Sequence, residues 1–258
     1  MLLLTWRVIE ELIRQSATMR EELAELYRQL PATRCQRKTY CCSMLPEMTL
    51  IEALAILKQM AAMNSDRRLV LLKKISSYFF LNAARISTCP FLDGQNCQVY
   101  EERFFGCRAY GLWSPAHYQK ITTGNQAAKK HLRKQWQALD VTLPRAVVDF
   151  QVPYCPDVQT VERTDLDDDV LVGIADAVES LSLHFSEAHQ SFRQSYYADF
   201  SFLVAAMLWS HRRAVQLKFD VVKEFLHTGQ RKKLNLILDQ CIDPFRESLD
   251  SLDNREAQ

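Results

Sequence analysis

Residues 49–63 read TLIEALAILKQMAAM, and this run sets the fold class. Thr49 is a good N-cap residue, and Glu52 three positions later completes the pattern of a capping box, so a helix is predicted from this point. The protein has only six glycines, of which four lie between Gly94 and Gly124. Because glycine-poor sequence favours long helices joined by few turns, a mainly α-helical protein is expected.

Further helices are predicted on both sides of this run. Ser114 followed by Pro115 is typical of a helix N-cap and first turn, and Gly229 is expected to end the aromatic-rich helical part. The acidic sequence TDLDDD suits the start of a helix in the C-terminal half. The predicted helices cover residues 5–30, 49–63, 65–81, 114–139 and 231–250, with further helical sequence through about residue 225.

Between and before these helices, irregular sequence holds two groups of cysteines. The groups are Cys35, Cys41 and Cys42, and then Cys89, Cys97 and Cys107 within CPFLDGQNCQVYEERFFGCRAYG, residues 89–111. Free cysteine normally occurs singly as a small buried side chain, so this clustering needs another explanation. Disulfides and a metal or iron–sulfur centre are the two that the pattern allows.

The composition of the chain and its expected location favour a metal centre over disulfides. The chain has 32 basic and 31 acidic residues, which gives no general attraction to nucleic acid. Its N-terminal apolar run is too short for a signal peptide, and no segment has the length of a membrane helix. We therefore expect a cytoplasmic protein, and in a reducing compartment grouped cysteines favour metal or redox chemistry over structural disulfides.

Thiolates in loops can converge on a metal from several directions. Four thiolates satisfy a tetrahedral zinc ion, and iron–sulfur clusters use the same number of cysteines. The spacing is not the CxxC pairing of a zinc ribbon, so the residues alone leave the metal open. Ordinary buried thiols and cytosolic disulfides remain as alternative interpretations.

The cysteine contexts resemble those of the YkgJ family of zinc- or iron-chelating cysteine-cluster proteins. The run Cys89-Pro90-Phe91-Leu92 matches the family's CPFL, and Cys97 followed by Val99-Tyr100 matches its Cx[IV]Y. Cys107-Arg108 matches the end of its RPxxCR, and the pair Cys41-Cys42 with Cys35 matches its CxxCxxCC group. The resemblance covers residues 35–110. It departs from the family where the second cysteine is absent and where Phe104 replaces proline.

This resemblance implies a metallocentre, and a [4Fe–4S] cluster is the preferred form because six or seven cysteines exceed what one zinc ion needs. Zinc is the alternative. Adjacent cysteines are expected to have divergent side chains, so ligation of one ion by both is less common, although a larger cluster can accept both. The expected core ligands are Cys42, Cys89, Cys97 and Cys107, followed by Cys35 and Cys41, with Cys155 as a seventh candidate and Cys241 as no ligand.

Three polar side chains near these cysteines are candidates for binding the cofactor. Arg103 and Arg108 can offset the negative charge of a thiolate cluster or bind an anionic ligand beside it. Tyr100 can pack over the centre and donate a hydrogen bond to it. Ordinary ion pairing of the arginines and core packing of the tyrosine are the competing interpretations.

The sequence contains no dinucleotide, P-loop, GxSxG or HExxH motif, so no active site is visible apart from the cysteines. The expected organisation is an N-terminal helix (1–30), a cysteine-cluster module (31–140), a linker or surface loop (141–160) and a helical C-terminal subdomain (161–258). Three functions follow as hypotheses: a redox or electron-transfer protein, a cluster-dependent enzyme like the flagellin lysine methylases of the resembled family, or a zinc-stabilised interaction module. A protein partner or protein substrate is expected, without nucleic acid or membrane, and the sequence leaves open the oligomeric state and the binding of S-adenosylmethionine.

Overall fold

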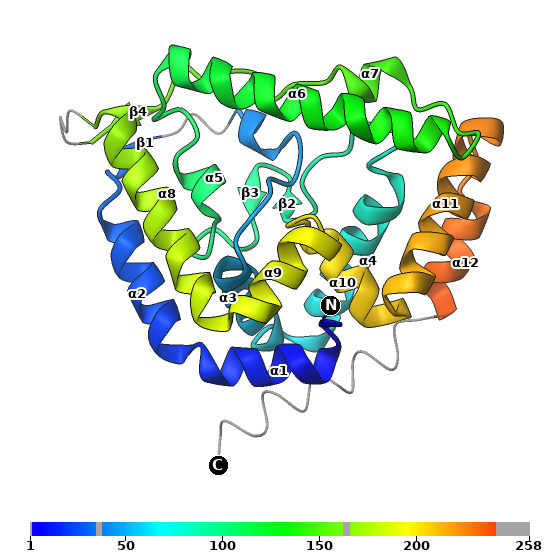
Figure 1. Cartoon of the computed structure of the whole chain (residues 1–258), viewed down its shortest axis with the longest axis horizontal. Coiled ribbons are helices and arrows are strands. Elements are labelled where there is room, and N and C mark those ends of the chain that lie inside the picture. The colour runs from blue at the N-terminus through cyan, green and yellow to red at the C-terminus, as the bar shows by residue number, and fades with distance from the viewer. Residues whose placement is uncertain (1, 35–37, 162–165, 241–258) are drawn as a thin grey trace.

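The computed structural model describes residues 2–34, 38–161 and 166–240, and these are mainly α-helical as predicted (Figure 1). The helices in the first half are α1 (Trp6–Gln15), α2 (Ala17–Arg28), α3 (Leu50–Ala61), α4 (Ser65–Leu81), α5 (Phe105–Arg108), α6 (Pro115–Gln137) and α7 (Arg145–Val148), with a 3₁₀ turn, η1 (Tyr40–Cys42). The second half contains α8 (Asp168–Ser182), η2 (Leu183–Phe185), α9 (Ser186–Ser195), α10 (Phe200–Trp209), α11 (His211–Thr228) and α12 (Lys232–Gln240).

Two short antiparallel ribbons are the β structure of the described residues. β1 (Thr33–Arg34) pairs with β4 (Gln159–Thr160), and β2 (Leu92–Asp93) pairs with β3 (Asn96–Cys97). The second ribbon turns at Gly94, whose φ of +58° lies in the left-handed region that glycine adopts without strain. This ribbon places Cys97 opposite Leu92.

The helix α3 lies at the centre of the molecule. Its N-terminus carries the predicted capping box, in which the Thr49 side chain accepts from the Glu52 backbone and the Glu52 carboxylate accepts from the Thr49 backbone N–H. Nearly every position of α3 is buried, which is typical of a helix that is apolar on all sides. It packs against α1, α2 and α8, while α10 packs against α4 and α11, and residues of both halves of the chain share one main core.

The predicted helix over residues 5–30 is interrupted in the structure. It divides at Ser16, which is fully buried and whose hydroxyl donates to the carbonyl of Ile13 at 3.0 Å. Helices α1 and α2 run in different directions on the two sides of Ser16 (Figure 1). The amphipathic spacing extends across Ser16, and it therefore did not reveal the break.

Other predicted ends are confirmed. Ser114 caps α6 by accepting from the backbone N–H of His117 at 3.1 Å. Gly229 ends α11 in the left-handed conformation, with φ of +70°. The last helix begins at Lys232, and the remainder of the predicted 231–250 helix lies outside the described residues. Among the described helices, none combines the length and apolar character that a membrane crossing requires.

Candidate metal centre

Three separate segments bring five of the predicted cysteines together. Cys41 and Cys42 lie in η1, Cys89 and Cys97 flank the first strand of the β2–β3 ribbon, and Cys107 lies in α5. The backbone N–H of Cys89 donates to the carbonyl of Cys42 at 2.8 Å, which joins the two cysteine groups directly. Figure 1 shows η1, the ribbon and α5 in the region beneath α6.

The adjacent cysteines do not diverge as predicted. Their Sγ atoms lie 3.7 Å apart, so both thiols of Cys41 and Cys42 face the same side of the chain. The 3₁₀ turn that holds them begins after Thr39, whose φ of +57° is unusual for a residue with a side chain. The prediction was wrong because this tight turn brings the two side chains together.

The thiols are set in mainly apolar surroundings. Cys89 belongs to the main hydrophobic core, and Cys42, Cys97 and Cys107 pack against it. Burial raises the pKa of Cys89 to about 12 and raises the pKa of Cys97. Burial, with the charges of Cys89, Cys41 and Cys97, also raises the pKa of Cys107 well above its ordinary value. Apart from the adjacent pair, these thiols are therefore protonated at neutral pH in the metal-free protein.

The adjacent pair behaves as one unit. A hydrogen bond between the two sulfurs is the main cause that lowers the pKa of Cys41 to about 7, and the charge of Arg103 acts in the same direction. The same hydrogen bond, together with burial, raises the pKa of Cys42. The first proton of the pair is therefore lost easily and the second is held, as expected for two coupled groups in contact.

The five thiols are suitable donors for a metal ion, but they do not form a complete ligand shell in this structure. In the part of the chain that the structure describes, no three or more histidine, cysteine, aspartate or glutamate side chains stand as ligands of one ion. All six described cysteines are free thiols. The mutual influence of the five clustered thiols on their pKa values nevertheless places them in one neighbourhood. Ligation of one ion by three or more of these thiols would therefore require their side chains to move.

One further predicted ligand, Cys155, lies at the margin of the cluster. Cys155 is buried and lines a narrow hollow of about 40 Å³ together with Cys41 and Cys107. Cys35 lies outside the described residues, and so does Cys241. The sequence predicted Cys155 as a seventh candidate ligand. In the structure it borders the cluster, although it lies in a distant segment of the chain.

The two arginines bind the loop that carries Cys107. The Arg108 guanidinium donates to the carbonyls of Arg103 and Glu101 and lies 4.3 Å from the centre of the Tyr27 ring. Arg103 lies 3.7 Å from the centre of the Tyr100 ring and donates to the Tyr100 carbonyl at 3.1 Å. Both arginines line the same narrow hollow as Cys41. In the described residues neither has a carboxylate partner within ion-pair distance.

Tyr100 is about half exposed to solvent, and its ring contacts the guanidinium of Arg103. The prediction that it tunes the centre stays a prediction.

Sequence reasoning missed the wider role of Glu52. This buried carboxylate accepts from the Tyr27 hydroxyl at 2.5 Å and from the backbone N–H of Phe105 at 2.5 Å. Since Phe105 begins α5, Glu52 ties the segment of Cys107 to α2 and α3. The capping-box pattern identified Glu52 as a helix residue, but no local signal pointed to these long-range partners.

Comparisons with protein-family models, with curated proteins and with solved structures each found no match to this chain.

Proposed function

We propose that this protein carries a cysteine-ligated metal centre, a [4Fe–4S] cluster in our preferred form, with a redox or electron-transfer role. Cys41, Cys42, Cys89, Cys97 and Cys107 are the residues that would hold it. A bound cluster of this kind supplies one-electron transfer. The observation that carries the proposal is the convergence of five thiols from three segments, joined by the Cys89 to Cys42 backbone hydrogen bond.

The chain's own residues would prepare this centre in two ways. The apolar surroundings of Cys89 exclude water from one side of the thiols. Arg103 and Arg108 line the other side and offer positive charge to offset that of several thiolates. A low-dielectric setting with nearby cations is the kind of environment that adjusts the reduction potential of an iron–sulfur cluster.

A structural zinc ion is the second candidate, and one distance favours it. A tetrahedral shell with sulfur about 2.3 Å from zinc places its sulfurs about 3.8 Å apart. The Cys41–Cys42 separation of 3.7 Å is close to that edge. In a [4Fe–4S] cluster each protein thiolate ligates a different iron, so two ligand sulfurs lie farther apart. The number of thiols favours the cluster, while this pair favours zinc.

The reduced thiols and the absence of any described membrane-crossing helix lead us to propose a cytoplasmic location. We also propose a protein as redox partner or substrate, because the hollow beside the cysteines, about 40 Å³, is too small for most organic molecules.

Metal analysis of anaerobically purified protein tests the proposal. A cluster predicts about four irons per chain and broad absorbance near about 400 nm, whereas zinc predicts one colourless ion. Cys107→Ala should abolish loading of either metal, and Cys241→Ser is the matched control that should leave it unchanged. Protein without stoichiometric metal after anaerobic reconstitution, or full loading of Cys107→Ala, would refute the site.

A further inference from the structure

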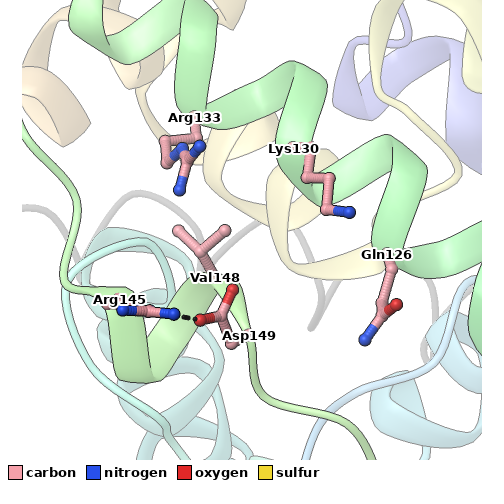
Figure 2. Close-up of a pocket in the computed structure, with 6 residues that line it drawn as sticks. All are labelled: Gln126, Lys130, Arg133, Arg145, Val148 and Asp149. Atoms are coloured by element: carbon pink, nitrogen blue, oxygen red, sulfur yellow. Dashed lines mark hydrogen bonds and ion pairs between the residues drawn. The ribbon is translucent and has the colours of Figure 1, made fainter.

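A second cavity lies away from the cysteines, between α6 and α7. Its volume is about 470 Å³, within the range of roughly 300–1,000 Å³ that small-molecule sites occupy. Figure 2 shows its walls, with three side chains from α6 on one side and the short helix α7 on the other. The lining residues are Gln126, Lys130, Arg133, Arg145, Val148 and Asp149.

The sequence of α6 makes this wall positively charged. Gln126, Lys130 and Arg133 follow one another at spacings of four and three residues, which places them on one face of the helix. The 23 residues of α6 include five lysines and arginines and no aspartate or glutamate. The helix therefore cannot neutralise these cations itself.

Little else in the described chain neutralises them. The lining contains one carboxylate, Asp149, and it already pairs with Arg145 at 3.0 Å. No ion pair reaches Lys130 or Arg133 from the described residues. The Nε of Arg133 is buried and has no hydrogen-bond partner there. A buried N–H without an acceptor is costly. No hydrogen bond or ion pair in the described residues occupies the other donors of this guanidinium, and because Arg133 lines the cavity, those donors can bind an anion there.

The walls are held in place by contacts that do not involve Lys130, Arg133 or Arg145. Val148 is buried in a small apolar cluster with Trp136 packed against it, and the Trp136 ring stacks on Phe219 of α11 at 6.1 Å. Lys129, beside the cavity-facing residues, donates to the carbonyl of Phe150 at 2.6 Å. The cavity is therefore a formed feature of the fold, with fixed spacing between α6 and α7.

We propose that this cavity binds a small anion carrying one or more phosphate groups. Lys130 and Arg133 receive the phosphate oxygens, with the planar guanidinium offering two parallel donors. Arg145 contributes further positive charge at the rim, and the Gln126 amide is placed to bind a neutral polar part of the ligand. Three cations against one carboxylate favour an anion of more than one charge. The site is independent of the proposed metal centre.

Isothermal titration calorimetry with inorganic pyrophosphate tests this site on the full chain. We expect one saturable site per chain. Arg133→Gln and Lys130→Gln should each weaken binding by about tenfold, because each removes a charge-assisted contact. Lys134→Gln is the matched control, since it removes the same charge from the neighbouring, exposed position that does not line the cavity. It should change the affinity by less than about twofold.

A further variant should strengthen pyrophosphate binding instead of weakening it. Asp149→Asn removes the carboxylate of the cavity, so it should tighten pyrophosphate binding severalfold, which a merely damaged fold would not do. Absence of saturable binding, or an equal loss in Lys134→Gln and Arg133→Gln, would overturn the proposal. Binding of single-stranded RNA or phosphatidylglycerol vesicles in the absence of pyrophosphate binding would assign the basic helix to a macromolecule and would also overturn it.

Discussion

Glu52 is a single buried residue that connects the helical core to the cysteine segments. Its carboxylate accepts from Tyr27, Phe105 and Thr49, each from a different part of the fold. A glutamine at this position has one oxygen and an NH₂ group, so it would leave buried donors facing another donor. We expect Glu52→Gln to lower the free energy of unfolding by about 2–3 kcal/mol in urea titrations.

Tyr27→Phe is the control for this prediction, because it removes one donor and keeps the carboxylate. Its expected loss is about 1 kcal/mol. Equal stabilities of wild type and Glu52→Gln would show that the carboxylate does not join these segments. Since Phe105 lies two residues before Cys107, lower metal content in Glu52→Gln than in Tyr27→Phe would place Glu52 as a positioning residue.

From the environment of Lys218 we predict that the stability of the protein depends on pH. Its amine donates to the Asn82 side chain at 2.8 Å and lies 4.3 Å from the centre of the Phe79 ring, and burial lowers its pKa from 10.5 to about 8. Below about pH 8 the folded protein bears the full cost of the buried charge. Between about 8 and 10.5 the unfolded chain binds more protons than the folded one, so stability rises with pH, and above 10.5 the cost is absent.

The variant Lys218→Met has no such group. Relative to it, the wild type should gain stability above about pH 8, by at most about 1.4 kcal/mol per pH unit. Urea unfolding of both proteins at pH 7, 8 and 9 measures the difference, in which the other titrating groups cancel. Parallel pH profiles would contradict a lowered pKa for Lys218.

At the scale of elements, the start of α6 is joined to the start of α8. The Asp168 carboxylate accepts from the backbone N–H of Ser114 at 2.8 Å and from its hydroxyl, while that hydroxyl also caps α6. We expect Ser114→Ala to cost about 1–2 kcal/mol, as loss of an N-cap usually does. A double-mutant cycle with Asp168→Ala should give a nonzero coupling energy. Additive effects would mean that the two helix ends are stabilised separately.

Helix ends that depend on neighbouring residues were predicted, whereas a helix break that depends on distant residues was not. Thr49, Ser114 and Gly229 were predicted correctly because capping residues act within a few positions of themselves. The break at Ser16 lies at a fully buried residue, and burial depends on contacts with other parts of the fold. Periodicity carries no information about such contacts.

The same distinction applies to the candidate site. The two cysteine groups are visible in the sequence, but the Cys89 to Cys42 hydrogen bond spans 47 positions of the chain and has no local pattern. The adjacent sulfurs lie 3.7 Å apart in a turn that begins after Thr39, and threonine is not a residue that predicts the left-handed backbone found there. The cavity between α6 and α7 likewise joins two segments whose composition alone indicates only exposed charge.

At the scale of the whole molecule, the cysteine cluster packs against the hydrophobic core but is formed by different segments of the chain. Helices α3, α4, α10 and α11 supply most of the main core, whereas the clustered cysteines lie in a 3₁₀ turn, in and beside the β2–β3 ribbon, and in the short helix α5. Metal binding would therefore stabilise the irregular segments chiefly, and the helices would retain apolar contacts of their own. A metal bound in this way would differ from that of small metal-dependent domains, which unfold entirely without metal.

Removal of the metal tests that division. Treatment of the loaded protein with a chelator should lower its melting temperature, because a metal bound only by the folded state adds its binding free energy to stability. Each kcal/mol lost corresponds to about 2–4 °C in a protein of this size. The far-UV circular dichroism at 25 °C should change little, since the helices lie outside the cysteine segments, while proteolysis near residues 40–43 and 89–108 should accelerate. Collapse of the helical signal on chelation would show instead that the centre holds the whole fold, and an unchanged melting temperature would show that the thiols bind no stabilising metal.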